Sequence, residues 1–268
     1  MNPKSTFLAC LALAGAICAP VHAQEQSARE QLALAHAQYY TPTASGLKSF
    51  HCEAAIDWKA MFARITGKEI PDDNPLLTYL NGIHLSVSDD LRGQGTLEWT
   101  SGDPAPAGKE AAVKQMREGF QGMVGGFFQS WNAYMNGTMV PVPDSKTTIT
   151  QSAEGVHLSA MANEMKIDED FDKNFLLTQA RVDSPSMRVV ALPSYTSTSD
   201  GLVVASVKSQ VRQPPTAPET DVNFQIEYAK VDGYQVPSHI AFDIKNVGMM
   251  DIRLSGCQVS LAQWARKQ

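Results

Sequence analysis

Long apolar runs are missing from this 268-residue chain. The run from Phe7 to Ile17 is shorter than the roughly 20 residues that a membrane-spanning helix needs, and no later segment reaches that length. Lys4 precedes this run, and Val21-His22-Ala23 follows it with the small-x-small pattern of a cleavage site. The sequence therefore predicts a signal peptide over 1–23, no transmembrane segment, and a periplasmic or secreted protein after cleavage near Ala23.

Cysteine is scarce, with four in the whole chain. Cys10 and Cys18 fall in the predicted signal peptide. Neither follows both a small residue and a full apolar run, so lipid anchoring is the less favoured alternative. Cleavage leaves Cys52 and Cys257. In an oxidising compartment this even pair predicts one disulfide, with two buried free thiols as the alternative. Two cysteines are too few for a metal site, and we expect none.

Basic residues are also in deficit, because 22 Lys and Arg stand against 28 Asp and Glu and give a net charge of -6. A nucleic-acid partner is therefore not expected, since it would require a basic face. There is no Gly-x-Ser-x-Gly elbow and no phosphate-binding glycine loop with a lysine. We predict a non-enzymatic protein without a cofactor, and a hydrolase assembled from scattered residues is the weaker alternative.

Three helices are expected. Ser27-Ala28-Arg29-Glu30 has the spacing of a capping box, which predicts a helix from Ser27 to about Tyr40. Asp72-Asp73-Asn74-Pro75 predicts a short capped helix with proline near its start. The segment from Gly108 to Asn136 predicts a long helix, and at about 100° per residue it has three different faces.

The long helix has a bulky apolar face, a narrow polar stripe and a side of small residues. Its apolar face must be buried, either as core or as the lining of a cavity. Glycine costs a helix roughly 1 kcal/mol relative to alanine, so the glycines from Gly119 to Gly126 predict the close approach of a backbone or a ligand. A break at Gly125-Gly126 is the alternative.

Alternating apolar residues predict strands in most of the remaining chain. Leu47 to Trp58 has this pattern, and from Lys146 onward the chain is a succession of strands. Asp232-Gly233 marks a hairpin, and a bulge at Gly256 would turn Cys257 inward to meet Cys52. Short turns between strands imply antiparallel pairing. The sequence thus predicts one α+β domain over 24–268, a strongly curved antiparallel sheet partly wrapped around helices, with a fully closed barrel as the less favoured alternative.

Acidic residues gather between Asp168 and Asn174. Their alternate oxygen ligands resemble those of a calcium loop, but Lys173 stands where such a loop needs glycine. A solvated hairpin tip is the preferred interpretation.

Three segments resemble the outer-membrane lipoprotein carrier family, the LolA-like proteins. They are the strand 46–54 with the helix before it, the hairpin-like stretch 167–177, and the strand pair 232–240. The resemblance covers most of the mature chain through loose patterns of strands and turns. It implies a half-barrel with helices over its apolar concave side and a cavity for a lipid or acyl chain.

We therefore expect a carrier or binding protein for a lipid, an acyl chain or a lipoprotein, with an envelope protein as a further partner. Six aromatic and methionine side chains on the long helix are the expected ligand lining: Phe120, Met123, Phe127, Phe128, Trp131 and Tyr134. The alternative is an interaction or scaffold domain with a filled core, which would act through surface loops such as Gln213 to Asp221.

Overall fold

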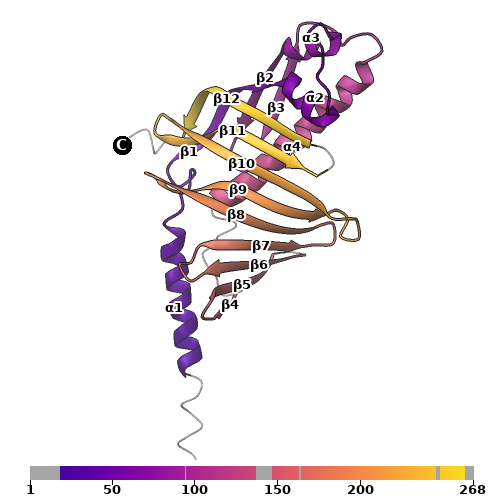
Figure 1. Ribbon diagram of the computed structural model, residues 1–268. Helices are drawn as coiled ribbons and strands as arrows, with labels where there is room; N and C mark the ends of the chain where they lie inside the picture. The colour runs from indigo at the N-terminus through magenta and orange to yellow at the C-terminus, as the bar shows by residue number, and fades with distance from the viewer. Residues whose placement is uncertain (1–18, 94, 137–146, 163, 246–247, 263–268) are drawn as a thin grey trace, which may run out of the picture.

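The computed structural model describes residues 19–93, 95–136, 147–162, 164–245 and 248–262. Most of the predicted signal peptide therefore lies outside the described residues. Within them, one antiparallel sheet of 12 strands runs in the order β3-β2-β1-β12-β11-β10-β9-β8-β7-β6-β5-β4. β3 and β4 are its two edges, so the sheet is unclosed (Figure 1).

The strands follow the alternation of the sequence, and every neighbouring pair is antiparallel, as predicted. Their bounds are β1 Leu47–Ile56, β2 Ile83–Asp89, β3 Thr96–Ser101, β4 Thr148–Gln151, β5 Gly155–Ala162, β6 Met165–Asp172, β7 Leu177–Asp183, β8 Arg188–Thr198, β9 Gly201–Arg212, β10 Thr220–Val231, β11 Tyr234–Ile244 and β12 Gly248–Leu261.

Four helices are described: α1 Ala19–His36, α2 Trp58–Thr66, α3 Pro75–Asn81 and α4 Glu110–Met135. The predicted start of the first helix at Ser27 is wrong, because the helix already begins at Ala19 and ends at His36. The capping-box spacing thus falls inside a helix that has started upstream. Cleavage near Ala23 would leave the part of α1 from Gln24 onward.

The α2 helix was not predicted. Trp58, assigned by its period to the first strand, is instead the first residue of this helix, and the Asp57 carboxylate accepts a hydrogen bond from the Ala60 N–H at 2.9 Å. The expected α3 is confirmed: the Asn74 side chain caps it and Pro75 opens it. Both short helices lie at the β2–β3 end of the molecule (Figure 1).

The long helix α4 is continuous through Gly125-Gly126, so the alternative of a break there is wrong. It crosses one face of the sheet, behind the strands in Figure 1. Phe127 of α4 packs against Phe224 of β10 and Phe242 of β11, with ring centroids 5.3 and 5.5 Å apart. We call the side of the sheet that carries Phe224 and Phe242 the α4 face, and the opposite side the outer face.

Cys52 of β1 and Cys257 of β12 form the predicted disulfide, with their Cα atoms 4.0 Å apart. The strand register shifts between His51 and Glu53 on β1. Gly256, opposite this shift, has φ +57°. The predicted bulge is therefore present, and it brings the two sulfurs together across neighbouring strands.

Candidate functional site

The six side chains predicted to line a cavity lie on the sheet-facing side of α4. Met123 is half-buried, while the other five are buried, and Phe128 and Trp131 are fully inaccessible. The structure therefore brings the six together along one helix face.

Aromatic rings from the sheet and from α2 fill the space around this helix face. Phe128 and Trp131 pack against Phe50 of β1, with centroids 5.7 and 6.0 Å apart. Phe120 packs against Trp58 of α2 at 5.2 Å. The Trp131 indole N–H donates to the Tyr228 hydroxyl at 2.9 Å. These contacts make the α4 aromatic side chains part of a packed core in this structure.

The glycine side of α4 faces outward. Gly119, Gly122 and Gly126 are exposed, and a Cβ built at any of them would meet no described atom within 4 Å beyond the neighbouring backbone of the helix itself. The prediction that these three glycines allow the close approach of another backbone is therefore wrong. Their spacing alone indicates no site.

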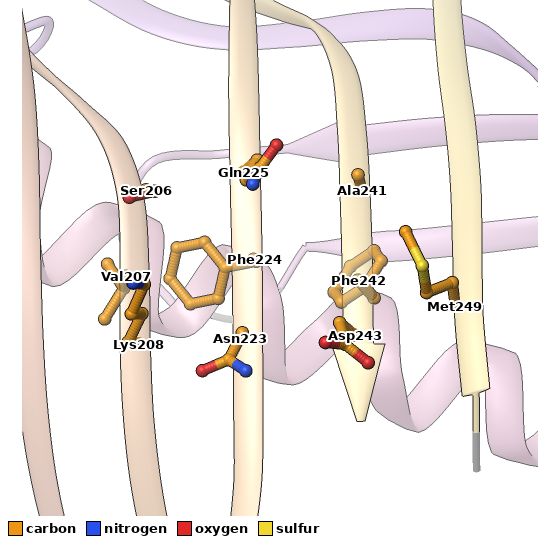
Figure 2. A pocket seen from close by; sticks show the side chains of 10 residues that line it. All are labelled: Ser206, Val207, Lys208, Asn223, Phe224, Gln225, Ala241, Phe242, Asp243 and Met249. Carbon is orange, nitrogen blue, oxygen red and sulfur yellow. The ribbon is translucent and has the colours of Figure 1, made fainter. Parts of the chain in front are cut away.

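A shallow pocket of about 190 Å³ lies across β9–β12 (Figure 2). By strand register, Lys208, Asn223 and Asp243 form one row on its outer-face side, and Ser206, Gln225 and Ala241 form the next. Small-molecule sites measure roughly 300–1,000 Å³ and are mostly apolar. This pocket is smaller, and none of the six predicted side chains lines it.

A row of apolar side chains crosses four strands on the α4 face. Strand register places Ile167 of β6 beside Val182 of β7, Val182 beside Val189 of β8, and Val189 beside Val211 of β9. All four are half-buried. We call this set the valine row.

The valine row shares its face with the core, because strand side chains at positions i and i+2 point to the same side. Ala180 and Ala191, two residues from Val182 and Val189, are buried at 1% and 4% exposure. The row is thus a partly accessible apolar surface that continues the core of the sheet.

Glu169 lies next to the valine row, two residues from Ile167 on β6. Its side chain is 1% exposed, and neither carboxylate oxygen has a hydrogen-bond partner among the described residues. Its partners across the strands are Leu158 and Ala180, both apolar and buried. Burial raises the pKa of Glu169 to about 9, so this carboxyl is protonated at neutral pH.

Three tyrosines come close to this carboxyl. Its charge contributes to raising the pKa of Tyr39, Tyr134 and Tyr195, although burial is the larger cause for each of them. The Tyr195 hydroxyl is also buried without a hydrogen-bond partner. The rings of Tyr39 and Tyr195 meet edge to face, with centroids 5.1 Å apart. We call Glu169 with these three residues the Glu169 cluster.

Glu169 is not among the predicted site residues, because it lies in the acidic stretch assigned to a hairpin tip. Ile167, Glu169 and Phe171 alternate with Asp168 and Asp170, so the apolar neighbours at i±2 indicated that Glu169 points inward. That signal was present in the sequence and was outweighed by the acidic composition of the stretch.

The hairpin itself is confirmed, since β6 and β7 flank a turn after Asp172. The expected solvated tip is wrong for Asp168 and Glu169, because both lie on β6 and are buried at 6% and 1% exposure. The Asp172 carboxylate accepts hydrogen bonds from the backbone N–H groups of Asn174 and Leu176. Asp170 accepts from Gln179 and contacts His157 at 2.7 Å. These carboxylates therefore stabilise the turn and the strand pairs.

No family model, curated protein or solved structure matches this chain. Among the helices described, none is both long enough and apolar enough to cross a membrane.

Proposed function

We propose that this chain is an exported, non-enzymatic carrier or binding protein that holds an apolar ligand against the α4 face of a half-barrel. The ligand would be a lipid, an acyl chain or the acyl part of a lipoprotein. The valine row is the observation that supports this proposal, because it is an apolar surface beside the core that is only partly covered.

The dimensions of the valine row suit an extended alkyl chain. Strands lie about 4.8 Å apart, so four side chains on four strands cover roughly 14 Å. A buried methylene contributes about 0.8 kcal/mol, and a chain laid along the row would gain that amount for each group removed from water. Association itself costs several kcal/mol, so coverage from the helix side is also needed.

In this proposal, the α4 side chains form the wall opposite the valine row. Met123 is half-buried and Tyr134 belongs to the Glu169 cluster, whereas Phe127, Phe128 and Trp131 are packed against the sheet. A ligand that reached all six would require α4 to move away from the sheet. Their role as lining stays a prediction.

Uptake of a neutral pyrene-labelled alkyl alcohol tests the proposal. Val189→Asp puts a charge into the valine row and should weaken probe binding at least about tenfold, since a desolvated charge costs more than the corresponding 1.4 kcal/mol. Val190→Asp is the matched control, because the next residue on the strand points to the outer face. Equal probe binding by the two folded variants would contradict the proposal.

A filled interaction domain is the second candidate, and the close packing of Phe50, Phe128 and Trp131 favours it. Such a protein would bind an envelope partner through its loops, including the segment between β9 and β10. In that case the wild-type protein would take up no probe, and both valine variants would behave like it.

A further inference from the structure

The Glu169 cluster has polar atoms that no described residue pairs. Unpaired buried polar groups are rare in folded proteins, because each one loses its hydrogen bonds to water without a replacement. In this cluster, both carboxyl oxygens of Glu169 and the hydroxyl of Tyr195 are buried and unpaired. No Lys, Arg or His side chain in the described part of the chain forms an ion pair with Glu169.

Separate elements hold the cluster in place. Glu169 belongs to β6, Tyr134 to α4 and Tyr195 to β8. Tyr39 follows α1, and its hydroxyl accepts the Leu177 N–H at 3.2 Å. Backbone hydrogen bonds join this segment to β9, because the Leu202 N–H donates to the Gln38 carbonyl at 2.8 Å. The cluster is therefore built by four parts of the fold.

We propose that the Glu169 cluster is the head-group subsite for an amine-bearing apolar ligand, whose alkyl part lies along the neighbouring valine row. This inference rests on the proposed carrier function and adds the chemical class of the ligand. A primary ammonium has three N–H donors. It would donate to the two Glu169 carboxylate oxygens and to the Tyr195 hydroxyl oxygen, the three acceptors left unpaired.

Charge favours an ammonium over an acidic head group. Burial keeps the Glu169 carboxyl protonated, and a bound ammonium would replace that proton as the compensating positive charge. The carboxylic acid then releases one proton to the solvent and becomes the carboxylate of an ion pair. The tyrosine rings add further preference for a cation. A fatty-acid carboxylate would find no basic side chain in the cluster.

Access to the site involves Tyr195. The side chain of this residue is half-buried although its hydroxyl is buried, and Ile167 beside Glu169 is also half-buried. The boundary between the cluster and solvent therefore consists of side chains rather than of sheet backbone.

Isothermal titration calorimetry with three ligands of equal chain length tests the proposal: dodecylamine, dodecanol and dodecanoate, each below its aggregation concentration. The wild-type protein should bind the amine at least about tenfold more tightly than the alcohol, because hydrogen bonds between charged groups are roughly twice as strong as those between neutral groups. It should bind dodecanoate most weakly. Titrations in buffers of different ionisation enthalpy at pH 7 should show release of about one proton for each amine bound.

Glu169→Gln keeps the shape of the side chain and removes the titrating acid. This variant should lose both the preference for the amine over dodecanol and the proton release. Glu164→Gln, at the exposed turn before β6, is the matched control and should retain both. Equal affinity of the wild-type protein for amine and alcohol would overturn the head-group inference and leave the carrier function standing. If none of the three ligands binds, both fail.

Discussion

The Asn132 side-chain amide of α4 donates to both carboxylate oxygens of Asp89 at the end of β2, with each N to O distance 3.0 Å. The two side chains are buried at 7% and 2% exposure. The Asp89 carboxylate also accepts the Leu91 N–H at 2.9 Å. This pair attaches the last turns of α4 to the β2 end of the sheet.

Asn132→Ala should destabilise the fold by about 1–3 kcal/mol, since it leaves a buried carboxylate with one donor fewer. Burial raises the pKa of Asp89 to about 6, and the Asn132 hydrogen bond opposes that rise. Removal of the amide raises the pKa further. The loss of stability should therefore be larger at pH 8, where Asp89 is ionised, than at pH 4.5.

Urea unfolding at these two pH values measures the effect. Gln129→Ala, at an exposed position of the same helix, should cost only a few tenths of a kcal/mol at both. An Asn132→Ala loss that does not change with pH would refute the charge-based explanation.

Glu169→Gln should stabilise the protein increasingly as pH rises. The folded-state pKa of about 9 lies above the unfolded value of about 4.3, so the folded state retains a proton that the unfolded state has lost. In the wild-type protein, the contribution of Glu169 to the unfolding free energy is fully present below about pH 4.3. It declines between about pH 4.3 and about pH 9, by at most about 1.4 kcal/mol per pH unit. The Glu169→Gln variant lacks this pH-dependent contribution to the unfolding free energy.

Unfolding of wild type and Glu169→Gln at pH 4, 6 and 8 tests this expectation. The difference in unfolding free energy should widen at each step in favour of the variant. A constant difference across the range would show that Glu169 is not held neutral in the fold.

Loss of the Cys52–Cys257 disulfide should cost about 2–5 kcal/mol, because it closes a long loop between residues 205 positions apart. The double variant Cys52→Ala, Cys257→Ala removes the disulfide, and alanine places no polar atom at the inaccessible position 52. Thermal unfolding with and without reductant measures the contribution. Reductant should lower the melting temperature of the wild-type protein and leave that of the double variant unchanged.

Gly126→Ala should stabilise α4 by about 0.5–1 kcal/mol, since the position is helical, exposed and open to a Cβ. Gly95→Ala is the opposite case, because a Cβ there would lie 2.5 Å from Phe128 Cδ2 and force the core to shift. Chemical unfolding of both variants checks the contrast. A destabilising Gly126→Ala would mean that the small side of α4 is covered in solution.

Local patterns predicted the elements whose signals are strong. The helical period of Gly108 to Asn136, with its three faces, predicted α4, and Asn74-Pro75 predicted the start of α3. The change of phase at Gly256 predicted the bulge that brings Cys257 to Cys52. Each of these depends on neighbours within a few residues. The sequence also indicated antiparallel strands, because the connections are too short for crossovers.

Other features depend on contacts that are distant in sequence. The pairing of β1 with β12 places the first strand inside the sheet between β2 and β12, and no local pattern specifies that order. Burial of Glu169 needs α4, β8 and the segment after α1 to gather around one carboxyl. Trp58 continued the strand period, but the Asp57 cap started a helix there instead. Tertiary context and capping outweighed the period in these places.

Mass spectrometry of the protein, purified without detergent from its native envelope, tests the central claim most directly. Native and denaturing spectra of the same sample would be compared. The carrier proposal predicts that denaturation removes a mass in the lipid range, and the head-group inference predicts that this mass belongs to an amine-bearing amphiphile. A ligand-free native mass, with no uptake of the neutral pyrene probe afterwards, would contradict the proposal and favour the interaction domain.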